Sequence, residues 1–238
     1  MKILQHPRNS DILFDPVAHT YYYQYTEVFD GVTGWVGKYK QPFNRDGISF
    51  AIARRDGISQ QEVLANWEEK RDSSAEYGNF AHDAIERWIK GQRRLKGQKE
   101  YVDLVKPVLE AEGLKPIDAE FVVYDEDIRK ASPIDVLCVR EATGKLVVVD
   151  TKTYEKGVEW KGYKDAKLLY PLHLLPDANF YHTSLQVGIY IKWLRDKYEA
   201  DVEDQGYILH LRPPQCSLIK TDNVQKEVEL MYEELRQS

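Results

Sequence analysis

The sequence predicts a mixed α/β (α+β) fold in which a central mixed β-sheet is flanked by helices. Three features support this: helix-like segments come early, a run of three strand-like segments follows, and a helix, a strand and a helix end the chain. With 238 residues, 42% of them hydrophobic, the chain can bury a sizeable core. We expect one domain, 1–238, with an N-terminal hairpin and helical part over 1–73 and the core over 74–238.

The N-terminal part is expected to begin with a β-hairpin. Its strand-like runs, 12–16 and 21–25, are joined by a proline-containing turn. A short helix is predicted over 32–39. Another helix is predicted over 59–71, because a serine N-cap precedes a glutamate by three residues in a capping-box pattern.

The predicted core begins with its strongest helix, over 74–90, where apolar residues recur at helical spacing. A further helix is predicted over 99–112. Three strands follow over 119–124, 134–139 and 146–152, and we expect them to form a meander.

The last part of the chain returns to helix and strand in alternation. A long amphipathic helix is predicted over 179–198, a fourth strand over 205–211 and a C-terminal helix over 222–235. The sequence has no internal repeat, low-complexity tract or glycine-rich phosphate loop.

Composition excludes several classes of protein. Two cysteines, Cys138 and Cys216, are too few for a disulfide framework, a zinc ribbon or an iron–sulfur cluster. No run of 18 apolar residues is present, so we expect a cytoplasmic protein with no membrane partner. The formal net charge of −6 argues against a protein that coats nucleic acid through bulk electrostatics.

Two local basic stretches qualify that conclusion. Basic residues gather over 90–99 and again over 156–167, and each stretch contains side chains that can contact a phosphate backbone. A solvated surface explains either stretch equally well. The candidate nucleic-acid contacts are Arg93, Arg94, Lys156 and Lys161.

Charged residues lie in two of the predicted core strands. Asp135 is embedded in one apolar run and Asp150 ends the next, and a buried charge is normally paired or bound to a metal. Strand alternation puts Lys152 on the same face as Asp150. Two carboxylates and a lysine suit phosphodiester hydrolysis, because hard oxygen ligands bind Mg²⁺ and a cation lies near the attacking water. A salt bridge at a sheet edge is the plain structural alternative.

Two helical pairs add further candidates. His82 and Glu86 lie four residues apart on one face of the 74–90 helix, and a neutral imidazole there can bind a divalent metal. Gln186 and Tyr190 similarly share a face of the 179–198 helix. Either pair alone is also what an ordinary helix surface or core would contain.

In this order the motifs resemble a known family. The chain is similar, over about 77–193, to the RecB-type branch of the PD-(D/E)XK nuclease superfamily, and its opening segment is similar to phage-type and mitochondrial exonucleases of that branch. The motifs that carry the resemblance are Gly78 to Glu86, Glu120, Pro133-Ile134-Asp135, Val149-Asp150-Thr151-Lys152-Thr153 and Gln186 to Tyr190. The resemblance implies a restriction-endonuclease-like core.

The resemblance also implies a metal site. His82, Asp135 and Asp150 would bind one or two Mg²⁺ or Mn²⁺ ions, with the backbone carbonyl of Thr151 as a further ligand. Glu120 would be a second carboxylate of the metal site. No iron–sulfur cluster is expected.

Catalytic roles follow from the same resemblance. Lys152 would orient or help deprotonate the water, while Gln186 and Tyr190 would position the strand or support Lys152. The sequence departs from the family at Ser132-Pro133, where a glycine is common; proline removes a backbone donor there.

The implied function is that of a metal-dependent DNA exonuclease acting on single- or double-stranded ends in recombination, repair or phage DNA metabolism. A phage-encoded protein would work in the cytoplasm of its bacterial host, with a recombination or annealing protein as its partner. Two alternatives stay open: a structure-selective endonuclease of the same fold, and a module that binds DNA ends without cutting them.

Overall fold

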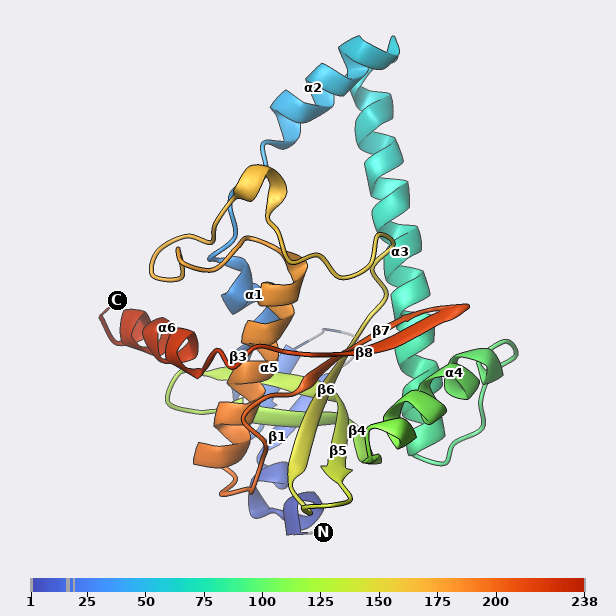
Figure 1. Cartoon of the computed structure of the whole chain (residues 1–238). Coiled ribbons are helices and arrows are strands. Elements are labelled where there is room, and N and C mark those ends of the chain that lie inside the picture. The colour runs from blue at the N-terminus through green and yellow to red at the C-terminus, as the bar shows by residue number, and fades with distance from the viewer. Residues whose placement is uncertain (1, 16–17, 19, 238) are drawn as a thin grey trace.

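The computed structural model describes residues 2–15, 18 and 20–237, and in this part of the chain eight strands form one mixed sheet (Figure 1). Strands β3 and β5, and likewise β6 and β7, pair in parallel, and the other pairs are antiparallel. The strands are β1 (Ile12–Asp15), β2 (Thr20–Tyr23), β3 (Glu27–Gly31), β4 (Leu114–Asp125), β5 (Lys130–Arg140), β6 (Leu146–Lys152), β7 (Tyr207–Arg212) and β8 (Gln215–Lys220). The predicted mixed sheet is therefore confirmed.

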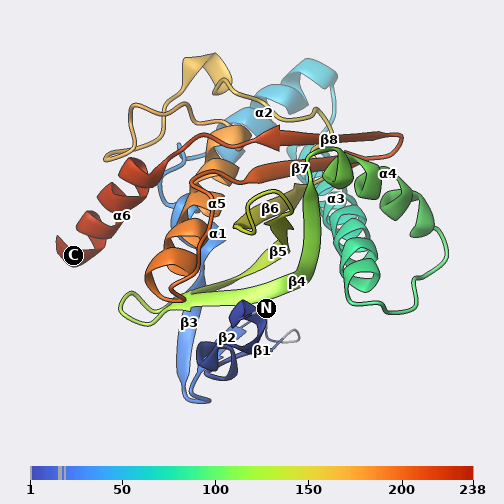
Figure 2. The ribbon, with the colours of Figure 1, turned by 60° about the horizontal axis from the view of Figure 1, so that its bottom comes forward.

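Helices cover both faces of the sheet. Figure 2 shows α1, α5 and α6 on one side, and α3 and α4 on the other. The helices are α1 (Val32–Gly37), α2 (Arg45–Asp56), α3 (Gln60–Ile89), α4 (Lys99–Ala111), α5 (Asn179–Asp196) and α6 (Gln225–Gln237). Among the described residues, none of these helices is long and apolar enough to cross a membrane.

Each face of the sheet has its own hydrophobic core, and β6 contributes to both. Leu146 and Val148 pack in the core under α5 and α6, whereas Val147 and Val149 pack in the core under α3 and α4. A strand covered on both faces needs apolar residues at every position, which explains the uninterrupted apolar run before Asp150.

The predicted hairpin and meander are both present. Strands β1 and β2 pair antiparallel, as do β4 with β5 and β5 with β6. Residue 16, at the end of the first predicted strand, and residues 17 and 19, in the predicted turn, lie outside the described part of the chain. The sequence did not predict β3 or β8, which extend the hairpin and the sheet edge.

The two helices predicted over 59–71 and 74–90 are one helix, and this prediction was wrong. Helix α3 runs unbroken for 30 residues from its capping box at Ser59. The polar stretch that separated the two predictions contains neither glycine nor proline, so nothing interrupts the backbone hydrogen bonds. The predicted boundary between 1–73 and 74–238 consequently falls inside α3.

Helix α2 and the first half of α3 form an arm that extends from the body (Figure 1). The arm is held by polar contacts: Arg45 pairs with Glu68 at 2.8 Å, and Gln60 donates a hydrogen bond to Ser49. Helix α2 was not predicted, because its apolar residues do not gather on one face.

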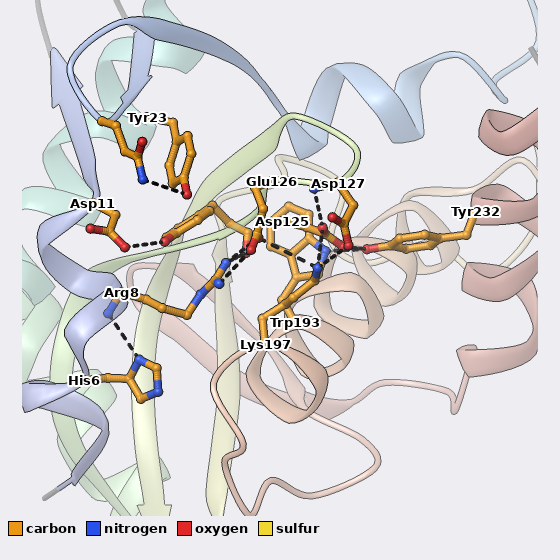
Figure 3. Close-up of polar contacts among 12 residues, drawn as sticks. His6, Arg8, Asp11, Tyr23, Asp125, Glu126, Asp127, Trp193, Lys197 and Tyr232 are labelled. Atoms are coloured by element: carbon orange, nitrogen blue, oxygen red, sulfur yellow. Dashed lines mark hydrogen bonds and ion pairs between the residues drawn. The ribbon is translucent and has the colours of Figure 1, made fainter.

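A polar network fastens the N-terminal segment to the sheet (Figure 3). The guanidinium of Arg8 donates to both carboxylate oxygens of Glu126, at 2.9 and 2.6 Å. It also lies over two aromatic rings, 4.1 Å from the Tyr124 centroid and 5.3 Å from that of Tyr198. One side chain thereby joins the N-terminal segment, the β4–β5 turn and the end of α5.

The same network continues to α6. Lys197 contacts Asp125 at 3.0 Å and Asp127 at 2.6 Å, and Asp125 accepts a hydrogen bond from the Tyr232 hydroxyl. That hydroxyl accepts in turn from the Trp193 ring nitrogen at 2.6 Å. The β4–β5 turn is thus bonded to both α5 and α6.

The variant Arg8→Ala should lower the free energy of unfolding by about 2 kcal/mol, because it removes charge-assisted hydrogen bonds from a partly buried carboxylate. Hydrogen bonding by Arg8 lowers the pKa of Glu126 to about 2 from its usual 4.5. The stabilisation is therefore present above pH 4.5 and is lost as the pH falls towards 2. Urea unfolding at several pH values measures both effects.

Arg129→Ala is the matched control, since its ion pair with Glu27 is exposed and 3.7 Å long. It should change the free energy of unfolding by less than about 0.5 kcal/mol. A difference between wild type and Arg8→Ala that does not shrink below pH 4.5 would contradict the assignment to Glu126.

Candidate functional site

Three acidic residues lie side by side across β4, β5 and β6. In β4, Ala119 pairs with Val136 and Phe121 pairs with Ile134, so Glu120 lies opposite Asp135 of β5. Val136 in turn pairs with Val149 of β6, and the next position in this register places Asp135 opposite Asp150. Residues directly opposite one another in antiparallel strands point to the same face of the sheet. The sheet therefore gathers like charges that need compensating cations.

Glu120 has an unusual backbone conformation. Its φ of 51° lies in the left-handed region, and it is skipped in the pairing of β4 with β5. For a residue with a Cβ this costs on the order of 1–3 kcal/mol, and such strain concentrates at functional sites. Here the distortion accompanies a carboxylate that reaches the imidazole of His82.

His82 lies on α3, the helix that packs against one face of the sheet, and its imidazole reaches the acids. Its Nδ1 lies 3.7 Å from Glu120 Oε1 and 3.7 Å from Asp135 Oδ2, and one ligand atom from each of the three residues fits within 4.8 Å of the others. Burial alone would lower the pKa of His82, but Asp135 and Glu120 raise it to about 9. The three side chains form the candidate metal centre.

Asp150 is placed differently from the other two acids. It is buried, and its Oδ2 lies 2.5 Å from the Nζ of Lys152. Burial raises the pKa of the Asp150 carboxyl, and Lys152 opposes that rise. Burial would lower the pKa of Lys152, but Asp150 and Asp135 raise it, so the lysine is a cation. In the described part of the chain Asp150 is not within the His82, Glu120 and Asp135 group.

Thr151 links the two parts of the site. Its backbone N–H donates to Asp135 Oδ2 at 2.7 Å, which fixes the carboxylate that faces His82. The role of the Thr151 carbonyl as a metal ligand stays a prediction.

Gln186 and Tyr190 meet as the helical spacing predicts. The Gln186 side-chain amide donates to the Tyr190 hydroxyl at 2.7 Å, and that hydroxyl lies 2.9 Å from the Ser132 hydroxyl. Tyr190 is fully buried, and burial raises its pKa. Sequence reasoning missed Ser132, which precedes the proline noted as a departure and bonds to a predicted site residue.

Several cavities that share lining residues lie around these side chains. The largest, of about 790 Å³, is lined by Glu120, Asp135, Lys152, Gln186 and Tyr190 and by residues of α1 and the N-terminal hairpin. Smaller cavities of about 390, 180 and 310 Å³ each share at least one residue with the site. His82, Glu120, Asp135, Lys152 and Gln186 each line two or more of these cavities, whereas the buried Asp150 lines none of them.

The four predicted nucleic-acid contacts lie in two different places. Lys156 and Lys161 are exposed in the segment that follows β6, and Glu155, next to Lys156, lines a cavity with His82 and Lys152. Arg93 and Arg94 are exposed in the loop after α3, which lies at the end of α3 away from the arm (Figure 1). Neither arginine lines the cavities at the site.

Arg212 is a cationic residue near the site that sequence reasoning also missed. It ends β7 and lines a cavity with His82 and Lys152. Because β6 and β7 are parallel, their carboxyl ends lie at the same edge of the sheet. Its position in the sequence, directly after the predicted strand 205–211, was the signal that could have identified Arg212 as a site residue.

Comparison with known proteins gives little further information. No family model and no curated protein matches the chain. One similar solved structure is the crystal structure of a putative exonuclease from Eubacterium rectale, with a TM-score of 0.40 and 11% sequence identity. The match covers 66% of this chain and 64% of that one, so the chain spans less than two thirds of that protein. A likeness of this size establishes no shared activity.

The variant Lys152→Ala should destabilise the fold by about 3 kcal/mol, because it leaves the buried Asp150 carboxylate without its cation. Adding Asp150→Asn should restore a substantial part of this loss, since the unpaired charge is then gone. Chemical denaturation of both variants measures the effect. Lys156→Ala, an exposed lysine nearby, should change stability by less than about 0.5 kcal/mol; equal losses in Lys152→Ala and the double variant would contradict the charge pairing.

Proposed function

We propose that the protein is a metal-dependent nuclease that hydrolyses phosphodiester bonds of DNA. The observation that carries the proposal is the row of Glu120, Asp135 and Asp150 across three strands, with His82 and Lys152 beside it. An ordinary salt bridge at a sheet edge needs one acid and one base. It accounts for neither the third carboxylate nor the strained backbone of Glu120.

The donor set fits a divalent cation. One imidazole nitrogen and two carboxylate oxygens lie within 4.8 Å of one another, and carboxylate oxygens are ligands that Mg²⁺ and Mn²⁺ prefer. We propose that His82, Glu120 and Asp135 hold one or two such ions, with Asp150 and the Thr151 carbonyl as the further ligands implied by the family resemblance. When bound, the cation polarises a phosphate oxygen and makes a water molecule more acidic.

Lys152 acts as a fixed cation in this proposal. Asp150 and Asp135 keep it protonated, so it orients the water and offsets negative charge on the phosphate rather than accepting a proton. Gln186 and Lys152 line two of the cavities together, and the hydrogen bond from Gln186 to the Tyr190 hydroxyl fixes the orientation of Gln186. The two residues thereby position the strand and the lysine.

The finer assignment is an exonuclease that acts on DNA ends. It rests on the resemblance to the RecB-type branch, as does DNA as the substrate. Lys156 and Lys161 are proposed to contact the DNA backbone beside the site, whereas Arg93 and Arg94 would contact only a longer substrate that reaches past α3.

Digestion assays should show metal-dependent loss of linear DNA. End-labelled single-stranded and duplex DNA and a closed circle are incubated with Mg²⁺, Mn²⁺ or EDTA. The variants Asp135→Asn, Asp150→Ala and Lys152→Ala should lose at least about 100-fold in rate, because the first two remove proposed metal ligands and the third removes the cation beside the reacting phosphate. Asp103→Asn, on the exposed surface of α4, is the control.

Each outcome of this assay has a distinct meaning. Cutting of the closed circle identifies an endonuclease of the same fold. Wild-type protein that binds the DNA but cuts none of the substrates is a DNA-end-binding module, and the proposal of a nuclease then fails.

Saturating Mn²⁺ should raise the melting temperature of the wild type by about 5–10 °C, because a ligand that binds only the folded state stabilises it. Asp135→Asn and His82→Ala should lose most of this shift, since each removes a proposed ligand atom. Differential scanning fluorimetry with and without Mn²⁺ measures it. An equal shift in wild type and both variants would place the bound ion elsewhere.

A further inference from the structure

A cavity of about 310 Å³ opens from Lys152 on the side of α3. It lies between α3 and the ends of β6 and β7, where the tip of the β7–β8 hairpin lies beside α3 in both views (Figures 1 and 2). Its lining includes His82, Thr151, Lys152, Thr153, Glu155 and Arg212. Three of them, His82, Thr151 and Lys152, belong to the proposed active site, so the cavity continues it.

Arg212 is held in a fixed orientation at this cavity. Its Nη1 donates to the backbone carbonyl of Thr153 at 3.2 Å, and its guanidinium carbon lies 5.0 Å from the ring centroid of Tyr77. The structure describes no ion pair between Arg212 and a carboxylate in residues 2–15, 18 and 20–237. The guanidinium of Arg212 is half-buried, and only one of its N–H groups donates to the described part of the protein. Its remaining N–H donors form a fork that matches two oxygens of a phosphate.

The other charged side chains around Arg212 are paired with one another, which leaves a positive charge for an anion to neutralise. Glu155 is an acid that lines the cavity, and it is paired with Lys70 at 2.7 Å. Lys152 is paired with Asp150, whereas Arg212 makes no ion pair among the described residues, although it lies near enough to Glu155 to help Lys70 lower the pKa of that carboxyl. The buried hydroxyl of Thr151, which has no hydrogen-bond partner among the described residues, adds another polar group.

We propose that Arg212 binds a backbone phosphate of the substrate strand, next to the phosphate held at Lys152. The cavity would thus be a second phosphate subsite, and the strand would pass between α3 and the ends of β6 and β7. Arg212 touches no bond that breaks; it sets the register of the strand on the site. This inference rests on the proposed function for its substrate, although phosphate binding at Arg212 is measurable without cleavage.

The test compares wild type with Arg212→Ala on a series of oligonucleotides that each carry one neutral methylphosphonate linkage. Affinity for a fluorescent single strand is measured by anisotropy in Ca²⁺. Arg212→Ala should weaken binding of the unmodified strand roughly 10- to 100-fold, since a charge-assisted contact is lost. At one linkage the neutral substitution should weaken wild type similarly and Arg212→Ala hardly at all, because the two changes remove the same contact.

Two further measurements separate binding from a purely structural role. Loss of one phosphate contact should lower the slope of log affinity against log salt by about 0.7 for Arg212→Ala. Arg212→Lys should keep that slope and lose most of the affinity, because a lysine lacks the fork. Arg195→Ala, whose ion pair with Asp204 lies on the surface of α5, is the control and should match wild type.

The outcomes are distinguishable from those of the digestion assays. The phosphate subsite is overturned, even if the protein is a nuclease, by two results together. The affinity losses from Arg212→Ala and from the methylphosphonate add at every linkage, and Arg212→Ala leaves the salt slope unchanged. If at one linkage the methylphosphonate weakens wild type but hardly weakens Arg212→Ala, and the protein cuts no DNA, the subsite is supported and the proposal of a nuclease is rejected.

Discussion

Like charges on neighbouring strands repel, and the row of Glu120, Asp135 and Asp150 can exist only where cations reach it. Much of the architecture supplies those cations. Helix α3 packs against the sheet so that His82 lies 3.7 Å from two of the acids, and β6 carries Lys152 to the third. The strain at Glu120 is tolerated because the surrounding strands fix it. A site that collects negative charge before any ligand binds is poised for a cation.

The core of this site could be predicted because its strands are buried on both faces. In such strands an acid stands out, so Asp135 and Asp150 were found from the apolar runs around them. Helical spacing likewise brought Gln186 and Tyr190 together correctly. The left-handed backbone at Glu120 and the full burial of Asp150 were not predictable, because both depend on tertiary packing.

The elements that were missed share a physical cause. Helix α2 spreads its apolar side chains around its axis, so it has no hydrophobic stripe to reveal it. The Arg45–Glu68 ion pair and hydrogen bonds from Gln60 join it to α3. Strand β8 is short and largely exposed at the sheet edge. Helix α3 was divided in two because its first half extends into the arm, away from the core that gives its second half an apolar face.

Parallel pairing of β6 with β7 explains how distant parts of the chain reach one site. Parallel neighbours require a crossover, and here α5 is the crossover that carries Gln186 over the end of β6. The same pairing brings the carboxyl ends of both strands to one edge, which places Arg212 beside Lys152. In open α/β sheets ligands bind at such edges. Strand β6 belongs to both arrangements: its antiparallel pairing with β5 aligns Asp150 with the other acids, and its parallel pairing with β7 brings Arg212 to the same edge as Lys152.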